Sequence, residues 1–295
     1  MAHSTTYSTD RGIASGAHRS YRHIKVRPIA GALGAEVGGV DAAGPLAPEV
    51  IAEIRHAWLA HLVIFLREQQ LTPHALVAFA RAFGEPMEYP QLKGLPECPF
   101  VTPVVKLEHE RVNFGGVWHS DTTYLDRPPM ASMLYAVETP PYGGDTLFAN
   151  QYLAYETLSD GLKQTLDGLT GVSTSTKAEV SRTREDRLRE SGATLKALMG
   201  EHPVVRTHPE TRRKALYINV AHTSHFRGWT EDESAPLLEY LFRQQVRPEF
   251  TCRFQWEPGS LAFWDNRCAQ HNPVNDYHGF KRVMHRVTLA GDKPV

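Results

Sequence analysis

The chain has few cysteines, no long apolar run and almost no net charge, and each shortage excludes a class of protein. Its three cysteines, at positions 98, 252 and 268, are too few and too scattered for a disulfide framework or a thiolate zinc site. Lys and Arg total 32 against 33 Asp and Glu, a net charge of −1, which indicates neither a nucleic-acid partner nor a membrane surface. No apolar run reaches the roughly 18 residues of a spanning helix, and no secretory apolar segment stands near residue 1. We therefore expect a soluble, cytoplasmic protein.

The remaining composition is that of an ordinary globular domain, with 41% hydrophobic and 22% charged residues in a chain of 295. Residues 1–20 are small, polar and aperiodic, which predicts a disordered tail. Residues 21–295 contain no internal repeat and no linker, so we expect a single domain. Within it, segment 173–200 is rich in Ser, Thr, Arg and Glu, and we expect a long mobile insertion there.

Short β-like runs outnumber the helical segments. Helices are predicted from Pro48, from Thr72 as N-cap with Pro73 in the first turn, and near 159–169 and 231–243. Strands are predicted at 24–29, 35–37, 62–66, 131–137, 145–149, 202–208, 214–220, 251–256, 260–265 and 282–291. This pattern predicts a mostly β protein with flanking helices, as a sandwich or jelly roll.

The stretch GGVWHSDTTYLDRPP, residues 115–129, places His119 and Asp121 two positions apart. Side chains i and i+2 of a strand point to the same face, so both could bind one ion. Such a pair, taken alone, is usually a surface pair. His271 offers a second imidazole far along the chain, and two histidines with one carboxylate form the facial triad of non-haem Fe(II) oxygenases. Zinc fits less well, because no HExxH glutamate supplies a general base.

In the run KRVMHRVTL, a strand would place Arg282, Met284 and Arg286 on one face. Two guanidinium groups on one face repel each other unless anions meet them, and arginine binds carboxylate or sulfonate through a bidentate fork. Two readings stay open from the pattern: a solvated surface pair, or binding sites for two anions.

These motifs, together with GALGAEVGGVD, PPYGGDTLFAN, GWTEDES and FWDNRCAQHNPVNDY, resemble the taurine and dichlorophenoxyacetate dioxygenases over nearly the whole chain. That family uses Fe(II), 2-oxoglutarate and O2. The resemblance implies a double-stranded β-helix, a cupin-like jelly roll in one domain. It also implies that His119, Asp121 and His271 bind iron.

The resemblance further implies that Thr146 and Arg282 bind 2-oxoglutarate, and that Arg286 binds the anionic head of the substrate. 2-Oxoglutarate would become succinate and CO2 while a C–H bond of the substrate is hydroxylated. Where the carbon bears a sulfonate, sulfate or aryloxy group, the product would collapse and release sulfite, sulfate or a phenol. Members of the family are often dimers or tetramers, so a homodimer or homotetramer is expected.

The sequence departs from the taurine enzymes around the expected substrate. Those enzymes carry His-Pro-x-Tyr where this chain has a segment beginning with Tyr89, and they place an asparagine where this chain has Gly115, with Asn113 nearby. His222 or His225 is expected to line the pocket, although a surface or outer position is the commoner fate of such histidines. The losses suggest an anion with a bulkier or less polar body than aminoethane.

Aromatic residues beside the expected ligands, namely Trp118, Phe263 and Trp264, are predicted as pocket walls, each with the alternative of being an ordinary core residue. The runs PQLKGLPE and TYLDRPP are more similar to aryloxypropionate dioxygenases, whereas MHRVTLAGDKP is more similar to taurine and alkylsulfate members.

Three rival functions stay open. A jelly roll that only binds its ligand would lack a metal ligand or the 2-oxoglutarate arginine, and this chain lacks neither. A cupin-like zinc hydrolase would differ in its metal. A dioxygenase of biosynthesis would act on an amino-acid-like or carrier-bound substrate.

Overall fold

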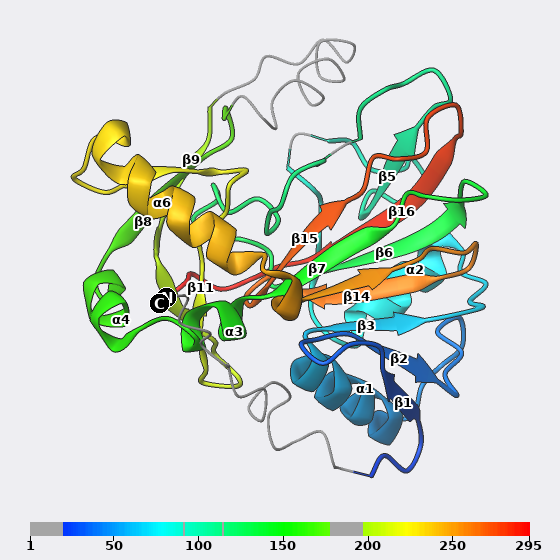
Figure 1. The fold of residues 1–295 in the computed structure, drawn as a ribbon. Coiled ribbons are helices and arrows are strands. Elements are labelled where there is room, and N and C mark those ends of the chain that lie inside the picture. Colours follow the sequence, from blue (N-terminus) through cyan, green and yellow to red (C-terminus); the bar gives the residue numbers. More distant parts are fainter. Residues whose placement is uncertain (1–19, 91, 114, 178–196) are drawn as a thin grey trace, which may run out of the picture.

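The computed structural model describes residues 20–90, 92–113, 115–177 and 197–295 (Figure 1). All but the last residue of the predicted tail at 1–20 therefore lies outside the described residues. The predicted insertion at 173–200 begins and ends inside two paired strands, because Ser173 pairs with Gly200 and Thr174 with Met199. Its limits were therefore set too wide, and residues 178–196 of it lie outside the described residues.

The largest element is an eight-stranded sheet in the order β1-β2-β3-β14-β6-β16-β4, with β5 paired to β16. Its strands are β1 (Lys25–Pro28), β2 (Ala35–Gly38), β3 (Val63–Leu66), β4 (Pro86–Met87), β5 (Val101–Lys106), β6 (Ala131–Glu138), β14 (Leu261–Asp265) and β16 (Arg282–Leu289). Apart from β2 with β3, the pairs in this major sheet are antiparallel.

A minor sheet in the order β13-β7-β15 packs against the inner face of the major sheet (Figure 1). Its strands are β7 (Thr146–Asn150), β13 (Thr251–Phe254) and β15 (Ala269–Pro273). Phe148 of β7 contacts Phe65 of β3 and Trp264 of β14, with ring centroids 5.7 and 5.8 Å apart. Two opposed, largely antiparallel sheets enclosing one core make the double-stranded β-helix that the sequence predicts.

Two smaller sheets flank this jelly roll. One has the order β12-β8-β9 and the other pairs β10 with β11. Their strands are β8 (Thr170–Thr174), β9 (Met199–Pro203), β10 (Val205–Thr207), β11 (Lys214–Leu216) and β12 (Thr223–Phe226).

The outer face of the major sheet is covered by helices α1 (Pro48–His61) and α2 (Pro73–Arg81), so β14 is buried on both faces. Ala262 and Trp264 of β14 face the minor sheet, while Leu261 and Phe263 face the helices. Phe263 stacks on Trp58 of α1, with ring centroids 4.4 Å apart. The prediction that Phe263 is a pocket wall is therefore wrong, because alternation along the strand turns it toward the other core.

Local signals explain where the helices begin. Thr72 accepts a hydrogen bond from the Ala75 amide, Ser159 accepts one from Leu162, and Thr230 forms a capping box with Glu233. The helices are α1 (Pro48–His61), α2 (Pro73–Arg81), α3 (Gln151–Glu156), α4 (Asp160–Leu166) and α6 (Glu231–Gln245), with a 3₁₀ turn η2 (Pro248–Phe250). Within the described ranges, no helix is both long enough and apolar enough to cross a membrane.

Candidate metal and anion site

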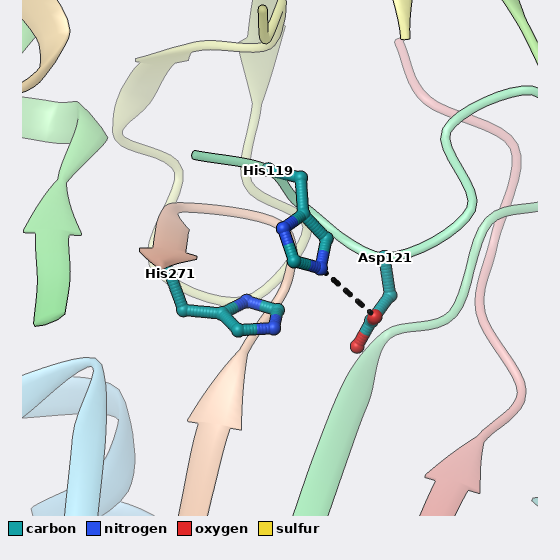
Figure 2. Close-up of side chains that lie close together, drawn as sticks. All are labelled: His119, Asp121 and His271. Carbon is teal, nitrogen blue, oxygen red and sulfur yellow. Dashed lines mark ion pairs between the residues drawn. The ribbon is translucent and has the colours of Figure 1, made fainter. Parts of the chain in front are cut away.

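The backbones of His119 and His271 join in a single bridge, in which each amide donates to the other's carbonyl, at 3.0 and 2.8 Å. His271 lies on β15, but His119 belongs to no extended strand, and Asp121 lies in a turn that continues through Thr122, whose φ is 45°. The predicted shared strand face is therefore wrong. The turn nevertheless brings Asp121 back toward His119, and their Oδ1 and Nε2 atoms lie 3.8 Å apart (Figure 2).

His119, Asp121 and His271 are buried, and one ligand atom from each lies within 4.8 Å of the other two. Figure 2 shows the three side chains converging from the bridge and the turn. Two imidazoles and one carboxylate at this separation fit a single metal ion of the Fe(II) type.

Hydrogen bonding prepares His119 as a ligand. Its Nδ1 lies 2.7 Å from the carbonyl oxygen of Val117. A carbonyl only accepts, so Nδ1 carries the proton and Nε2 keeps its lone pair on the side of Asp121. Burial lowers the pKa of His119, with Asp121 acting in the opposite direction, and burial holds the pKa of His271 well below its ordinary value. Both imidazoles are therefore neutral at neutral pH, as metal ligation requires.

Asp121 is held by a buried network. Ser132 of β6 donates to Oδ2 at 2.6 Å, and the Asn266 amide donates to the same oxygen at 3.4 Å. Asn266 is itself held by Trp264, whose Nε1 donates to it at 2.9 Å. Burial alone would raise the pKa of Asp121, but the Arg286 guanidinium, aided by the hydrogen bond from Ser132, keeps the pKa below its ordinary value. Asp121 is therefore a carboxylate, oriented through Oδ2 and presenting Oδ1 to His119.

A cavity of about 470 Å³, counting its open mouth, connects the histidines with the predicted 2-oxoglutarate residues. His119, His271, Thr146, Arg282 and Arg286 all border it. The predicted wall Trp264 borders it too. Trp118 is half-buried and, among the described residues, is not part of the cavity lining.

Thr146 and Arg282 form a polar end of this cavity. Thr146 accepts a hydrogen bond from Trp256 Nε1 at 2.9 Å, and the Arg282 guanidinium lies 5.5 Å from the Trp256 ring. Arg282 is 5% exposed, and its Nε and Nη2 have no hydrogen-bond partner within the described part of the chain. Burial lowers the pKa of Arg282, with the nearby Tyr277 hydroxyl opposing the shift. A buried guanidinium with open donors fits an anion such as the distal carboxylate of 2-oxoglutarate.

Arg286 lies on the same face of β16 as Arg282 and is also buried. Its Nη1 lies 3.3 Å from Asp121 Oδ1, and its guanidinium covers the ring of Tyr89 at 3.8 Å. The two arginines are thus not a solvated surface pair. The predicted shared face of Arg282 and Arg286 is present in the structure.

The predicted substrate contacts divide between two places. Tyr89 supports Arg286, and the His222 ring lies 6.2 Å from that of His119 and 5.0 Å from that of Tyr124. Asn113 lies instead near Arg282, where its amide donates to the carbonyl of Val274 at 2.9 Å. It thus anchors the end of β15.

Two neighbouring positions complete this part of the site. Gly115 has a φ of +74°, and a Cβ there would lie 3.0 Å from His119 Cε1, so glycine leaves the imidazole room. His225 is half-buried on β12, where its Nδ1 pairs with the Ser224 hydroxyl, 2.9 Å away.

A second cluster with metal-binding side chains, His208, Asp265 and Cys268, is already saturated. The Nδ1 atom of His208 accepts from the amides of Glu210 and Thr211, and its Nε2 lies 3.0 Å from Asp265. The Nε and Nη2 atoms of Arg267 donate hydrogen bonds to the Asp265 carboxylate, at 2.8 and 2.7 Å. Since these groups satisfy one another, the cluster is a structural network.

The site also contains residues that the sequence did not reveal. Ser132 and Asn266 hold Asp121, and Lys106 is buried beside Arg282. Ser132 lies within an otherwise apolar strand, and Lys106 is the last residue of another. A polar residue in such a strand was the sequence feature that could have indicated both.

The sequence model of the "Taurine catabolism dioxygenase TauD, TfdA family" matches residues 25–288. An alkylsulfatase of Acinetobacter baylyi is 34% identical over 282 residues, covering 92% of this chain and 86% of the relative. An alpha-ketoglutarate-dependent sulfate ester dioxygenase of Pseudomonas putida is 34% identical, covering 92% of this chain and 91% of the relative. A 2,4-dichlorophenoxyacetate dioxygenase of Cupriavidus pinatubonensis is 30% identical, covering 92% and 99%.

Solved structures agree with this assignment. A taurine dioxygenase from Burkholderia xenovorans superposes with a TM-score of 0.80 at 40% identity, covering 93% of this chain and 91% of that one. The structure of AAD-2, in complex with Mn(II) and N-oxalylglycine, superposes with a TM-score of 0.77 at 26% identity, covering 92% and 99%. Enzymes of this kind are oxidoreductases that use Fe(II), 2-oxoglutarate and O2. With a jelly roll, a two-histidine and carboxylate cluster and matches along almost its whole length, the chain belongs to the taurine catabolism dioxygenase TauD, TfdA family.

Proposed function

We propose that this protein is a Fe(II)- and 2-oxoglutarate-dependent dioxygenase that hydroxylates a small organic anion, and that a sulfate ester is its preferred substrate class. One observation carries the proposal. A single cavity is bordered by two neutral, buried imidazoles and by two buried guanidinium groups, one of which contacts the Asp121 carboxylate. The cavity therefore brings metal-binding groups and two anion-binding groups together.

Each residue has a proposed role. His119, Asp121 and His271 bind Fe(II), and a two-histidine, one-carboxylate set leaves coordination positions open. Bound Fe(II) supplies the activation of O2 that couples decarboxylation of 2-oxoglutarate to hydroxylation of a C–H bond. Thr146 and Arg282 hold the distal carboxylate of 2-oxoglutarate.

Around these groups the protein provides orientation and a shielded environment. Phe148, Leu134 and Trp264 border the same cavity with apolar surface and limit the entry of water.

Arg286 is proposed to bind the anionic head of the substrate. Its charge-assisted donors suit sulfate, sulfonate and carboxylate alike. Tyr89 presents an aromatic face beneath Arg286 where the taurine enzymes have a histidine, which favours a substrate with an apolar body over taurine itself. The relatives that act on sulfate esters, each covering 92% of this chain, support the sulfate ester class.

For an alkyl sulfate, hydroxylation by itself leads to release of sulfate. Hydroxylation of the carbon that bears the ester oxygen gives RCH(OH)OSO₃⁻. Its C–O bond to sulfate then breaks, leaving an aldehyde and hydrogen sulfate. The other products are succinate and CO₂.

Anaerobically prepared Fe(II) protein, given 2-oxoglutarate and O2, tests this function through succinate formation. The panel contains alkyl sulfates, taurine, longer alkylsulfonates and both enantiomers of an aryloxypropionate. Stimulation by alkyl sulfates with stoichiometric sulfate release is the expected result. Stimulation by an aryloxypropionate with phenol release would move the substrate to the class of the 2,4-dichlorophenoxyacetate relative. Succinate without stimulation by any of them would keep the dioxygenase and point to an amino-acid-like or carrier-bound substrate. No succinate at all would overturn the proposal.

The protein is also proposed to work in the cytoplasm as a homodimer or homotetramer. Its three cysteines are buried free thiols, which suits a reducing compartment. Light scattering of the purified protein tests the assembly, and a monomer at micromolar concentration would refute it.

A further inference from the structure

Lys106, the last residue of β5, is a buried lysine with an open ammonium group. It is 3% exposed, and its Nζ has no hydrogen-bond partner in the part of the chain that the structure describes. Its Nζ lies 4.5 Å from the centre of the Tyr277 ring. A lysine is almost never fully buried unless paired, since desolvating an ammonium is unfavourable. A cation–π contact compensates for only part of that.

Lys106 lies directly opposite a second buried cation. β5 and β16 are antiparallel, and the register pairs Lys106 with Arg282. Directly opposed residues share a face of the sheet, and like charges in that arrangement destabilise it. The Asp145 carboxylate influences Arg282, but its Oδ2 is already held by Arg253 at 2.6 Å. The other Asp145 oxygen, Oδ1, has no hydrogen-bond partner in the described part of the chain. The same holds for Lys106 Nζ and for Arg282 Nε and Nη2, so both cations keep donors open to a further anion.

Both cations border the same cavity. Lys106, Arg282, Asn113 and Tyr277 border a small cavity with about 250 Å³ of empty space, counting its mouth. This cavity shares Val104, Pro273 and Arg282 with the larger cavity that contains the histidines. None of the three candidate metal ligands borders the smaller cavity among the described residues. The two cations thus meet at the part of the site away from the metal ligands.

We propose that Lys106 and Arg282 together form a two-cation receptor for the distal carboxylate of 2-oxoglutarate, with Lys106 as a second co-substrate-binding residue. The inference rests on the proposed function and extends it to a residue on a different strand. A carboxylate offers two oxygens with about four acceptor sites, enough for the open Nε and Nη2 of Arg282 and for Nζ of Lys106. Binding a dicarboxylate also removes the repulsion between the cations. Affinity is therefore concentrated on the charged end of the co-substrate.

A rival role for Lys106 is purely structural, through its contact with Tyr277. The two roles differ in what they do to a ligand that lacks the distal carboxylate. A receptor cation affects only ligands that carry the carboxylate. A structural contact affects all ligands equally, together with the stability of the protein.

The test measures the binding of 2-oxoglutarate and of 2-oxopentanoate to anaerobic Fe(II) protein by calorimetry. The second ligand ends in a methyl group in place of the distal carboxylate. Lys106→Met keeps a long unbranched side chain and removes the charge, and Lys106→Arg restores a cation. Lys281→Met is the matched control. Lys281 is half-buried, borders neither cavity among the described residues, adjoins Arg282 in sequence and pairs with Glu138 at 2.8 Å.

Lys106→Met is expected to weaken 2-oxoglutarate binding by about 10- to 100-fold, the usual size of a hydrogen bond to a charged group. Its affinity for 2-oxopentanoate should stay within about twofold of the wild type. Lys281→Met should bind both ligands as the wild type does, and Lys106→Arg should recover part of the loss. Without ligand, Lys106→Met should unfold at the same Tm as the wild type or a higher one, because an uncompensated buried charge is gone.

Three results would overturn the proposal. Unchanged 2-oxoglutarate affinity in Lys106→Met, or an equal loss for both ligands, removes Lys106 from the receptor. A lower Tm with that equal loss assigns the residue to the structural contact. If the folded wild-type protein binds no 2-oxoglutarate, the proposed function itself fails, and this outcome is separate because it requires no variant.

Discussion

Arg286 directs Nη1 toward Oδ1 of Asp121 at 3.3 Å, so the arginine proposed for the substrate contacts the carboxylate proposed for the metal. The two residues come from β16 and from the turn after His119, 165 positions apart along the chain. An anion bound by Arg286 and an ion bound by Asp121 would therefore be neighbours. If Arg286 binds the substrate as proposed, this contact would place the head of the substrate beside the metal ligands.

Replacing a proposed metal ligand should abolish metal binding. We expect His119→Ala to lose Fe(II) binding by more than the roughly 10- to 100-fold that an outer hydrogen-bond partner supplies, and to form no succinate. Because the ligand supports chemistry more than packing, its Tm without metal should stay near that of the wild type. Metal titration and calorimetric unfolding measure both. His225→Ala, a change at a half-buried histidine on β12, is the control, and full succinate formation by His119→Ala would refute the assignment.

Removing the support of Asp121 should weaken the metal site without destroying it. Ser132→Ala deletes the 2.6 Å hydrogen bond to Oδ2, and we expect Fe(II) affinity to fall by about 10- to 100-fold. The matched control is Ser120→Ala, because Ser120 is also buried but donates to the Ala269 carbonyl instead. Equal metal affinities of the two variants would show that the Ser132 contact does not orient the ligand.

Variants of the two arginines of β16 should each weaken the binding of a different anion. Arg286→Met is expected to raise the KM for the anionic substrate by about 30-fold or more, as loss of one partner of a buried charged pair implies. Slow succinate formation without substrate should persist. Arg282→Met should instead raise the KM for 2-oxoglutarate. Steady-state kinetics with each compound varied in turn checks this, and the reverse pattern would exchange the two roles. Metal content is measured alongside, since Arg286 also touches Asp121.

The buried network of His208, Asp265 and Arg267 should determine how the free energy of unfolding changes at acid pH. Burial alone would raise the pKa of Asp265, but Arg267 and His208 outweigh it and keep the pKa below its ordinary value. A carboxyl whose pKa is depressed by folding stabilises the protein above its unfolded pKa, near 4, and this stabilisation is lost as the pH falls toward the folded pKa. At pH 7, Asp265→Asn should lower the free energy of unfolding by about 3–5 kcal/mol, because the charge of Arg267 is left buried.

Urea unfolding measures that difference at pH 7 and at decreasing pH below about 4, where the gap between Asp265→Asn and the wild type should narrow. Asp167→Asn is the control, because Asp167 is exposed and forms a loose ion pair with Lys214, at 3.6 Å. It should change stability by less than about 1 kcal/mol. A constant gap across the whole pH range would show that the charge of Asp265 is not what stabilises the fold.

Several features could be read from the sequence because they depend on local pattern. Thr72 and Pro73 start α2 as predicted, and the alternation in RVMHRVTL places Arg282 and Arg286 on one buried face. The family motifs likewise indicated His119, Asp121 and His271, which the fold brings together. Helix α3 was not predicted, because its six residues are too few to show a helical period.

Other features depended on which segments lie opposite one another. His119 and Asp121 meet through a turn rather than a shared strand face, because the bridge to His271 fixes the first and the turn redirects the second. The sequence does not distinguish the neighbouring aromatic residues Phe263 and Trp264, yet of these two only Trp264 faces the cavity. Local periodicity gives two faces without saying which one the minor sheet covers.

By itself, then, the sequence indicated most of the elements and the types of the candidate metal ligands through residue chemistry and short-range spacing, and its family motifs indicated an anionic substrate. Only the tertiary structure decided that Lys106 is buried opposite Arg282 and that Asn113 anchors β15. The reason is physical: burial and charge pairing arise between strands distant in sequence, and no local pattern records which strand lies across from which.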